Sequence, residues 1–348
     1  MIALHLALAS VLVQGAGSAW AEGPRLPQPI ANNAVAVAMV DGDPTVFSFM
    51  GLDETRAWSG VASHAFSWRV GSMAWRELQP VPGPGRLAGT AQGHDGKVYL
   101  FGGYTVAEDG SEKSAPNVNI YHPALRTWGA GAPMPLPSDD AVSGLWRDSL
   151  IYVVSGWHDT DNVRDVQIYD PGRDEWQAAT PIEGPPVFGH AGAISGNTIV
   201  YLDGVRTRPE VPHFVMEGSA WRGDIDPNDP TRIEWTRLPP HPGPPLYRAA
   251  AGSFGPWVLF AGGTDNPYNY DGLGYDGAPS EPRTLVLGFN VETGEWREFA
   301  PLATASMDHR ALVVAAHALI IVGGMVGGQR VSDLVTIGLV EDVLGTGR

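Results

Sequence analysis

The same short pattern, an apolar stretch that stops at glycine, recurs along the whole chain. Residues 96–103 read GKVYLFGG. Counting Gly103, the pattern ends at six glycines: Gly51, Gly103, Gly156, Gly204, Gly263 and Gly324. Neighbouring glycines are 48 to 61 residues apart. A period of this length is typical of repeat architectures such as propellers, in which each repeat is one supersecondary unit.

A tryptophan forms a second marker in each repeat. The five tryptophans that follow the first five glycines are Trp75, Trp128, Trp176, Trp235 and Trp296. Between glycine and tryptophan lies a further strand and a tight turn, as in NVNIYHPALRTW at 117–128. Each unit therefore has four antiparallel strands, and the tryptophan is expected to pack between neighbouring units. The sequence predicts an all-β fold, a six-bladed β-propeller with four antiparallel strands per blade.

The sixth glycine is followed by no tryptophan, so one blade lacks an outer strand. The start of the chain resembles the segments that leave an outer strand, since RLPQPIANNAVAVA matches RLPPHPGPPLYRAAAG. We expect residues 24–30 to pair with the last blade near residues 334–340. This N-terminal strand of the mature chain closes the ring and removes exposed sheet edges. Residues 22–348 are predicted to form a single propeller domain.

The first 21 residues read as a secretory signal peptide, with an apolar core and Ala19-Trp20-Ala21 as the cleavage site. We expect an exported protein, periplasmic or secreted, with no membrane association after cleavage. The formal net charge of −16 disfavours nucleic acid and anionic membrane surfaces as partners. The chain has no cysteine, which excludes disulfides, thiolate metal sites and cysteine nucleophiles.

The candidate site is on one face of the predicted propeller. If the strands of a blade are named a to d from the axis outward, the b–c and d–a connections share one face. That face carries the long inserts at 104–117, 205–217 and 264–282, and we call it the insert face. Loops on a rigid scaffold are where binding and catalytic residues usually lie. The d–a segments bring further polar residues toward the axis on the same face.

These side chains suit a sugar or a carboxylated sugar. Guanidinium groups bind carboxylates in pairs of hydrogen bonds, and aromatic rings cover the apolar faces of sugars. The predicted acid–base residues are His190, His309, Asp140 and Asp308. The predicted substrate-binding residues are Arg86, Arg248, Arg310, Tyr247, Asn266, Tyr268 and Tyr270. The alternative for each arginine is that it only ties blades together.

No cofactor or metal is predicted. His158, Asp159 and Asp161, or Asp308 with His309, match no specific metal-binding spacing. The acidic run at 226–230 is expected to form a turn on the opposite face. No phosphate loop, dinucleotide fingerprint or nucleophile elbow is present.

With six copies in register, the chain resembles kelch-repeat propellers over nearly its whole length. Kelch propellers include copper radical oxidases, whose chemistry needs a cysteine and is therefore excluded. Over its last two blades the chain resembles the N-acetylneuraminate epimerases, periplasmic enzymes that interconvert the anomers of sialic acid. The shared stretches are VLFAGG with a long insert, and HRALVVAAHALIIVGGMVGGQRVSDLVTI. That resemblance implies a catalytic glutamate where this chain has Val205, and an acidic residue at Met325.

Two function classes follow. The first is an exported mutarotase or epimerase that acts on sialic acid or a related sugar. The second is a non-catalytic kelch module that binds a carbohydrate or a protein partner, because a fold alone does not determine an activity.

Overall fold

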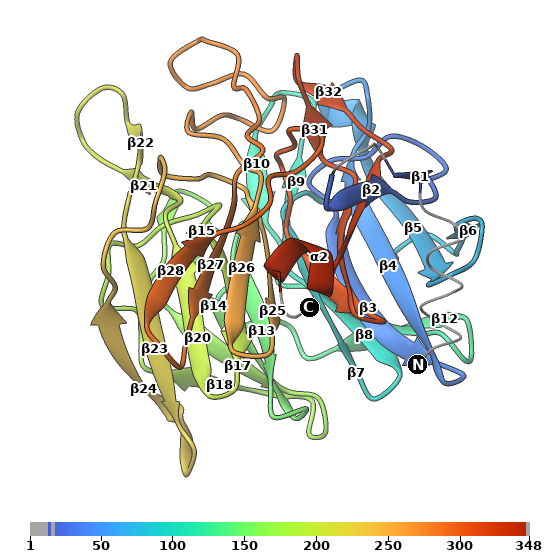
Figure 1. Ribbon diagram of the computed structural model, residues 1–348, viewed down its shortest axis with the longest axis horizontal. Helices are drawn as coiled ribbons and strands as arrows, with labels where there is room; N and C mark the ends of the chain where they lie inside the picture. Colours follow the sequence, from blue (N-terminus) through green and yellow to red (C-terminus); the bar gives the residue numbers. More distant parts are fainter. Residues whose placement is uncertain (1–12, 15–17, 346–348) are drawn as a thin grey trace.

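The computed structural model describes residues 13–14 and 18–345. Most of the predicted signal peptide lies outside the described residues. Six β-sheets stand around a common axis (Figure 1), and each has four strands in the antiparallel order a-b-c-d, with one extra strand in the last. Within the described part of the chain, no helix is long and apolar enough to cross a membrane. The predicted six-bladed propeller is confirmed.

The strands of each blade follow one another from the axis outward. They are, for blades 1 to 3, β3 (Ala34–Val40), β4 (Asp43–Leu52), β5 (Val61–Arg69) and β6 (Arg76–Glu77); β7 (Thr90–His94), β8 (Lys97–Phe101), β11 (Val118–His122) and β12 (Thr127–Gly131); β13 (Val142–Trp146), β14 (Leu150–Val154), β17 (Val166–Asp170) and β18 (Glu175–Ala179). For blades 4 to 6 they are β19 (Ala191–Ser195), β20 (Thr198–Leu202), β23 (Ala220–Asp226) and β24 (Asp229–Arg237); β25 (Ala250–Phe254), β26 (Trp257–Ala261), β27 (Val286–Asn290) and β28 (Glu295–Glu298); β29 (Val313–Ala315), β30 (Ala318–Val322), β33 (Val335–Leu339), β2 (Trp20–Glu22) and β1 (Val13–Gln14).

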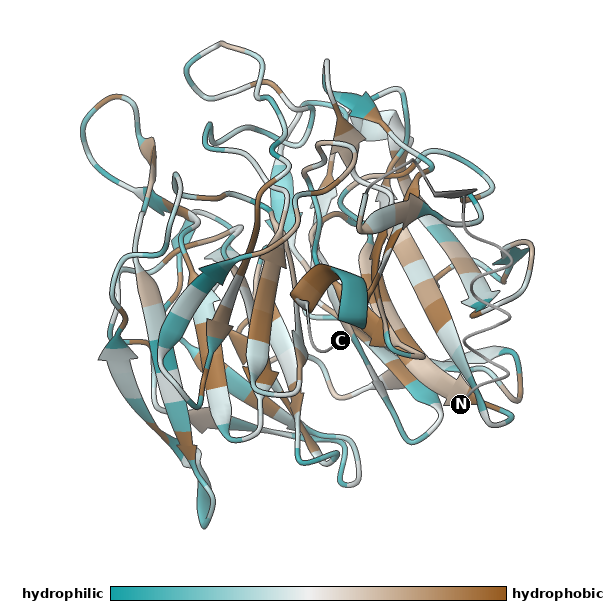
Figure 2. Cartoon of the chain, viewed as in Figure 1, coloured by the Kyte–Doolittle hydropathy of each residue, from teal (hydrophilic) through white to brown (hydrophobic). Residues whose placement is uncertain are grey.

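The remaining elements are short and belong to the inserts or to the end of the chain. They are β9 (Tyr104–Val106), β10 (Glu112–Ser114), β15 (Trp157–His158), β16 (Asp161–Asn162), β21 (Val205–Thr207), β22 (Phe214–Met216), β31 (Met325–Val326), β32 (Arg330–Val331), the 3₁₀ helix η1 (Trp58–Gly60) and the helix α2 (Val340–Leu344). The insert hairpins gather at one face, at the top of Figure 1. Figure 2 shows the hydrophobic residues concentrated on the blade strands, with the turns and inserts mostly hydrophilic.

The second strand of every blade ends at a glycine, which is preceded by another glycine in blades 2, 5 and 6, and close backbone contacts explain both positions. At Gly102, with φ +57°, an added Cβ would lie 2.1 Å from the carbonyl oxygen of Ser138 in the next d–a segment. At Gly103, with φ +85°, it would lie 2.6 Å from the carbonyl oxygen of Leu87 in the blade's own segment. Glycine is present in all six blades at the second position, whereas Met50, Ser155 and Asp203 take the first position in three blades, also with positive φ. The repeated glycines therefore let each blade contact both d–a segments that flank it.

The repeat tryptophans fasten each blade to its neighbour. Their indole N–H groups donate to carbonyl oxygens of the preceding blade's exit segment: Trp75 to Pro24, Trp128 to Gln79, Trp176 to Ala132, Trp235 to Thr180 and Trp296 to Pro239. The same bond is made by Trp20, which donates to Ala300 at 2.9 Å. Trp20 is thus the sixth repeat tryptophan.

An N-terminal strand closes the ring, as predicted, but residues other than 24–30 form it. Trp20, Ala21 and Glu22 pair with Gly338, Ile337 and Thr336 of β33. Residues 24–30 instead continue alongside the last blade, with Leu26 donating its N–H to Asp333 and Ile30 to Ser332. The predicted register was wrong because the prolines at 24, 27 and 29 lack the N–H groups that a strand needs.

Candidate functional site

Six d–a turns meet at the axis and form a closed ring, which we call the axial ring. It consists of one left-handed residue from each blade, with φ between 49° and 66°: Asn32, Ala88, Asp140, Gly189, Arg248 and Asp308. Hydrogen bonds of 2.8 to 3.1 Å join each turn to the next around the axis. Non-glycine residues in this conformation are strained, and such residues cluster at functional sites. We therefore expect functional residues in or beside the axial ring.

A buried charge cluster fills the middle of the axial ring. The Arg248 guanidinium donates from Nε and Nη2 to both oxygens of Asp140, at 3.1 and 2.7 Å, and from Nη1 to Asp308 at 3.2 Å. Arg310 donates from Nη1 to Asp140. All four side chains are 3% exposed or less. Two arginines and two aspartates balance in charge, so the cluster as a whole offers no uncompensated cation.

The two aspartates of the charge cluster differ in acidity, because the pKa of Asp140 is lowered and that of Asp308 is raised. Burial opposes the ionisation of Asp140, but Arg248 and Arg310 outweigh it and lower its pKa. Burial raises the pKa of Asp308, although the same two arginines act in the other direction. The Arg248 pKa is raised by Asp140 and its other neighbours despite burial. Arg248 also lies over the rings of Tyr247 and Tyr268, at 4.9 and 5.2 Å from their centroids.

A small pocket opens above the axial ring on the insert face. Its cavity volume is about 50 Å³. The residues that line it are Tyr104, Glu112, Asp139, Asp140, Trp157, Phe188, Phe214, Arg248, Asn269 and Tyr275. Five aromatic rings thus form most of the wall, and three carboxyl groups, one guanidinium and one amide supply the polar groups. Pockets of this kind, apolar with a few convergent polar groups, are the default binding sites of folded proteins.

Asp139 is the buried acid of this pocket, which we call the insert-face pocket. Its side chain is 2% exposed and accepts a hydrogen bond of 2.5 Å from the Ser114 hydroxyl. Burial and the neighbouring Asp140 raise the pKa of Asp139 well above its usual value. This shift favours the protonated carboxylic acid at Asp139, in contrast to Asp140 beside it, whose pKa is lowered.

Glu112 is the second carboxyl group with a raised pKa. It belongs to the same hairpin as Ser114 and lies at the rim, where its side chain remains exposed. Loss of hydration at the pocket mouth, and Asp140, raise the pKa of Glu112 to about 7, against the effect of Arg248. A carboxylate with this pKa is a stronger base than an ordinary glutamate at neutral pH.

The repeat itself shows why Asp139 is unusual. The residue before each axial-ring position pairs with the first insert residue, and in the other five blades it is Ala31, Leu87, Phe188, Tyr247 or Met307. These five side chains are buried in one apolar cluster. Asp139 is the single carboxyl group at this position. An alignment of the six d–a turns would have found it from sequence, whereas Glu112 carries no such signal because the inserts do not repeat.

Three of the predicted site residues lie outside the insert-face pocket and are engaged in contacts within the blades and d–a segments. Arg86 donates to the Gly102 carbonyl and to Asn119, at 2.6 and 2.5 Å, so it ties its own blade together. His190 bonds to the Val154 carbonyl at 3.1 Å, and burial lowers its pKa to about 4. His309 bonds to Ser306 at 2.7 Å, and burial and Arg310 lower its pKa to about 3. Both histidines are therefore neutral and buried at physiological pH.

The other predicted residues lie around the same centre in different roles. Asp140 and Arg248 line the insert-face pocket, while Asp308 and Arg310 complete the charge cluster below it. Tyr247 and Tyr268 are fully buried against Arg248. Asn266 donates to Asp276 at 3.2 Å within its own loop, and Tyr270 packs against the apolar cluster beneath the inserts. Asn269, from the same loop, reaches the pocket instead.

The described residues hold no group of three or more histidine, aspartate and glutamate side chains arranged to bind a metal ion. The histidine and aspartates at positions 158, 159 and 161 lie on or beside the β15–β16 hairpin. Asp159 accepts a hydrogen bond from the Ser114 N–H, and Asp161 accepts one from Thr207. These aspartates are engaged in holding neighbouring inserts together.

Comparison with known proteins supports a kelch-repeat propeller. No family model matches the chain. It is 27% identical over 215 residues to beta-scruin of Limulus polyphemus, covering 60% of this chain and 23% of that protein. It is 24% identical over 244 residues to N-acetylneuraminate epimerase of Haemophilus influenzae, covering 56% and 61%. Kelch-like protein 15 of Gallus gallus is 31% identical over 111 residues, covering 31% and 22%.

These matches span less than two thirds of each relative's length. Among solved structures, one described as the structure of YjhT superimposes with a TM-score of 0.70 over 90% of this chain and 95% of that one. At 18% identity, this likeness concerns the fold. The comparisons confirm the resemblance to kelch-repeat propellers and to N-acetylneuraminate epimerases.

The two departures from the epimerase pattern have a structural reason. Val205 is fully buried and pairs with Phe188, and Met325 is fully buried and pairs with Met307. Both side chains belong to the apolar cluster beneath the inserts. Carboxyl groups reach the insert-face pocket from Asp139 and Glu112 instead.

Proposed function

We propose that this kelch-repeat β-propeller binds the reducing end of a neutral sugar in the insert-face pocket and catalyses exchange between its anomers. The observation that carries the proposal is the pair Asp139 and Glu112. Both line one aromatic-walled pocket, and both have raised pKa values. Titratable groups with shifted pKa values in a pocket are the usual mark of acid–base catalysis.

Anomer exchange needs one acid and one base. In the proposed step, the Glu112 carboxylate removes the proton of the anomeric hydroxyl while Asp139 donates its proton to the ring oxygen. The bond between the anomeric carbon and the ring oxygen breaks, which gives the open-chain carbonyl form. Rotation of the carbonyl and the reverse proton transfers close the ring as the other anomer, so both carboxyl groups return to their starting states.

The charges of the pocket favour a neutral sugar over sialic acid. All three nitrogen atoms of the Arg248 guanidinium already donate to Asp140 and Asp308. No free guanidinium therefore lines the pocket, and ionised Glu112 would repel a substrate carboxylate. The cavity of about 50 Å³ is far below the about 300–1,000 Å³ of pockets that enclose a drug-sized ligand. It suits the edge of one sugar ring, with the rest of the sugar against the inserts.

The test is NMR of freshly dissolved neutral aldoses, with N-acetylneuraminate as the acidic comparison. Catalytic amounts of protein should speed anomer equilibration of at least one neutral sugar more than that of N-acetylneuraminate. Asp139→Asn and Glu112→Gln should each lower the rate about 100- to 10,000-fold, the usual contribution of a positioned acid or base. Asp109→Asn and Glu108→Gln, on the same hairpin as Glu112 but outside the pocket, are the matched controls.

Buffer-like rates for every sugar would overturn the enzymatic proposal. They would favour the second candidate, a non-catalytic binding module. A specific observation supports it: Trp58, Val211 and Leu273 are 43%, 81% and 47% exposed, and all three lie in connections of the insert face. Exposed apolar side chains on one face are typical of a surface that binds another macromolecule.

Export to the periplasm or the medium is part of the proposal. The apolar N-terminal segment with small residues after it supports a cleaved leader, and the absence of cysteine is compatible with an oxidising compartment. Fractionation of cells that express the full-length chain tests this, because retention in the cytoplasm with an intact N-terminus would contradict it.

A further inference from the structure

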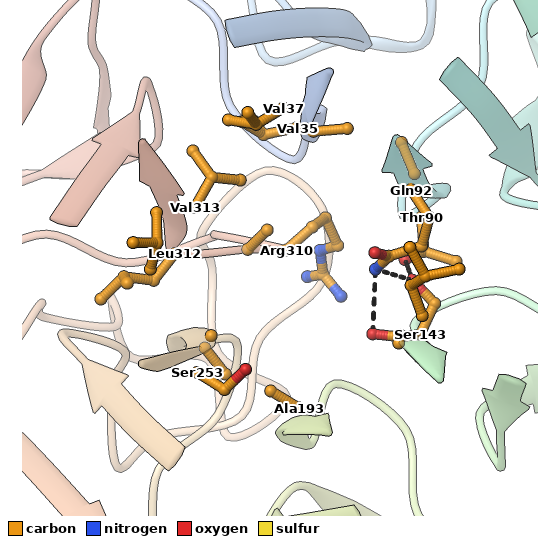
Figure 3. Close-up of a pocket in the computed structure, with 18 of the residues that line it drawn as sticks. Val35, Val37, Thr90, Gln92, Ser143, Ala193, Ser253, Arg310, Leu312 and Val313 are labelled. Carbon is orange, nitrogen blue, oxygen red and sulfur yellow. Dashed lines mark hydrogen bonds between the residues drawn. The ribbon is translucent and has the colours of Figure 1, made fainter. Parts of the chain in front are cut away.

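A second cavity lies on the propeller axis, below the charge cluster. It has a volume of about 260 Å³ and is walled by the innermost strand region of every blade, through Val37, Gln92, Ser143, Ala193, Ser253 and Leu312 (Figure 3). These strands start at the axial ring and end at the short a–b turns. The cavity, which we call the axial channel, therefore extends from the axial ring toward the face opposite the inserts.

Arg310 closes the inner end of the axial channel. Figure 3 shows its guanidinium group inside the ring of wall residues. The side chain is only 3% exposed, and Nη1 is bonded to Asp140. Its Nε and Nη2 atoms have no hydrogen-bond partner among the described residues. The nearest carboxylate oxygen to Nη2, on Asp308, is 3.8 Å away and outside hydrogen-bonding distance.

The two unpartnered nitrogen atoms of Arg310 favour a ligand with two neighbouring hydrogen-bond acceptors. Nε and Nη2 lie on one edge of the guanidinium plane, where their N–H bonds run parallel. This edge receives a carboxylate side-on through two hydrogen bonds, the geometry that makes arginine a preferred carboxylate-binding residue. Buried polar groups without partners are rare in folded proteins and call for a specific explanation.

A third group beside Arg310 fits the same ligand. The carboxyl group of Asp308 is buried beside Arg310 and also interacts with the Tyr268 hydroxyl. Burial raises the pKa of this carboxyl group. Because the four charges of the cluster balance, uptake of one anion together with one proton on Asp308 leaves the buried site neutral.

We propose that the axial channel binds a small monovalent oxyanion, such as a short-chain carboxylate, side-on at Arg310. The site is separate from the insert-face pocket, since Arg310 does not line that pocket. The inference does not rest on the proposed sugar chemistry. The channel volume admits a short carboxylate and leaves room for its apolar end between Val37, Ala193 and Leu312.

Equilibrium dialysis of the full-length protein against ¹⁴C-labelled acetate tests the proposal. The wild-type protein should bind one acetate per chain. Arg310→Gln removes the parallel N–H pair and should weaken acetate binding at least tenfold. Val37→Phe adds an aromatic ring at a residue of blade 1 that lines the channel, and should have a similar effect. Arg232→Gln, an exposed arginine on β24, is the matched control and should bind as the wild type does.

Thermal melts of all four proteins show whether each variant is folded before its binding is compared. Equal acetate affinity in the wild type, Arg310→Gln and Val37→Phe would place the anion elsewhere and overturn the proposal. Absence of saturable binding by the wild-type protein would also overturn it.

Discussion

Each d–a segment has an outer end and an inner end, and the two ends differ in how strictly they repeat. At the outer rim, all six segments accept an indole N–H bond from a tryptophan of the adjoining blade. At the axis, the same six segments present Asn32, Ala88, Asp140, Gly189, Arg248 and Asp308. Hydrogen bonds link neighbouring blades at both ends, but the side chains repeat only at the rim.

This difference indicates that the side chains at the rim serve stability, whereas those at the axis also serve function. A side chain that must fill the same gap between every pair of blades is fixed by packing. At the axis, the ring of backbone bonds holds the turns in place, so the side chains are free to differ. The charge cluster and Asp139 are the result. We therefore expect changes at the rim to act through folding alone, and changes at the axis to act on both folding and chemistry.

The largest effect on stability is expected at the axis. Asp140→Asn keeps a residue that tolerates positive φ but removes the charge that compensates Arg248 and Arg310. Breaking a buried ion pair from one side costs about 3–5 kcal/mol. Urea unfolding should show this loss. Asp95→Asn, at a left-handed but exposed turn position, is the control and should change stability by about 0.5 kcal/mol or less.

A comparable effect is expected at the rim where the ring closes. A chain that begins at Glu22 lacks Trp20, which is 1% exposed and packs with the core of the last two blades. Loss of a buried tryptophan costs about 3–5 kcal/mol. A chain that begins at Trp20 should keep this core and melt at a clearly higher temperature. Equal melting temperatures would show that Trp20 does not close the ring in solution.

The comparison of these two chain starts also bears on where a leader would be cleaved. If a leader is removed, cleavage before Trp20 keeps the whole closing strand, and Gly17-Ser18-Ala19 supplies small residues at the first and third positions. Cleavage after Ala21 would remove Trp20. N-terminal sequencing of the exported protein distinguishes the two.

The fold could be predicted from sequence because propeller packing repeats a signal six times. The glycine that ends each second strand and the repeat tryptophan are required by contacts that every blade makes, so each copy reinforces the others. Trp20 was missed because it precedes the first blade and lies within an apolar stretch that also suits a leader. The site was harder to predict, because Arg86 and Arg248 lie two positions apart in equivalent turns and only Arg248 lines the pocket. Partner choice between buried charges depends on geometry that a two-residue offset changes.

The pH profile tests whether Glu112 is the base. Its pKa of about 7 means that activity should rise about tenfold per pH unit up to about pH 7 and then level off, while the raised pKa of Asp139 favours its acid form. The folding stability should change with pH in the opposite direction to the activity. A carboxyl group whose pKa is raised on folding stabilises the protein below its unfolded pKa, and this stabilisation is lost as the pH rises through 7.

The melting temperature of the wild type should therefore fall more between pH 4.5 and 7.5 than that of Glu112→Gln. The comparison with this variant removes the contributions of Asp139 and Asp308, which have the same sign and are present in both proteins. Parallel melting curves for the two proteins would show that the pKa of Glu112 is not raised by folding.

The smallest expected effect tests whether the rim is uniform. Trp176→Phe and Trp20→Phe each keep an aromatic ring but remove the N–H that bonds to Ala132 or Ala300 at 2.8 or 2.9 Å. A neutral hydrogen bond contributes about 0.5–1.5 kcal/mol, and both variants should lose an amount in that range, measured by urea unfolding. Anomer exchange should be unchanged in both, because neither tryptophan reaches the insert-face pocket. A loss of stability confined to Trp176→Phe would mean that the closing strand is held more weakly than the other five outer strands, while a loss of activity in either variant would contradict the separation of rim and axis.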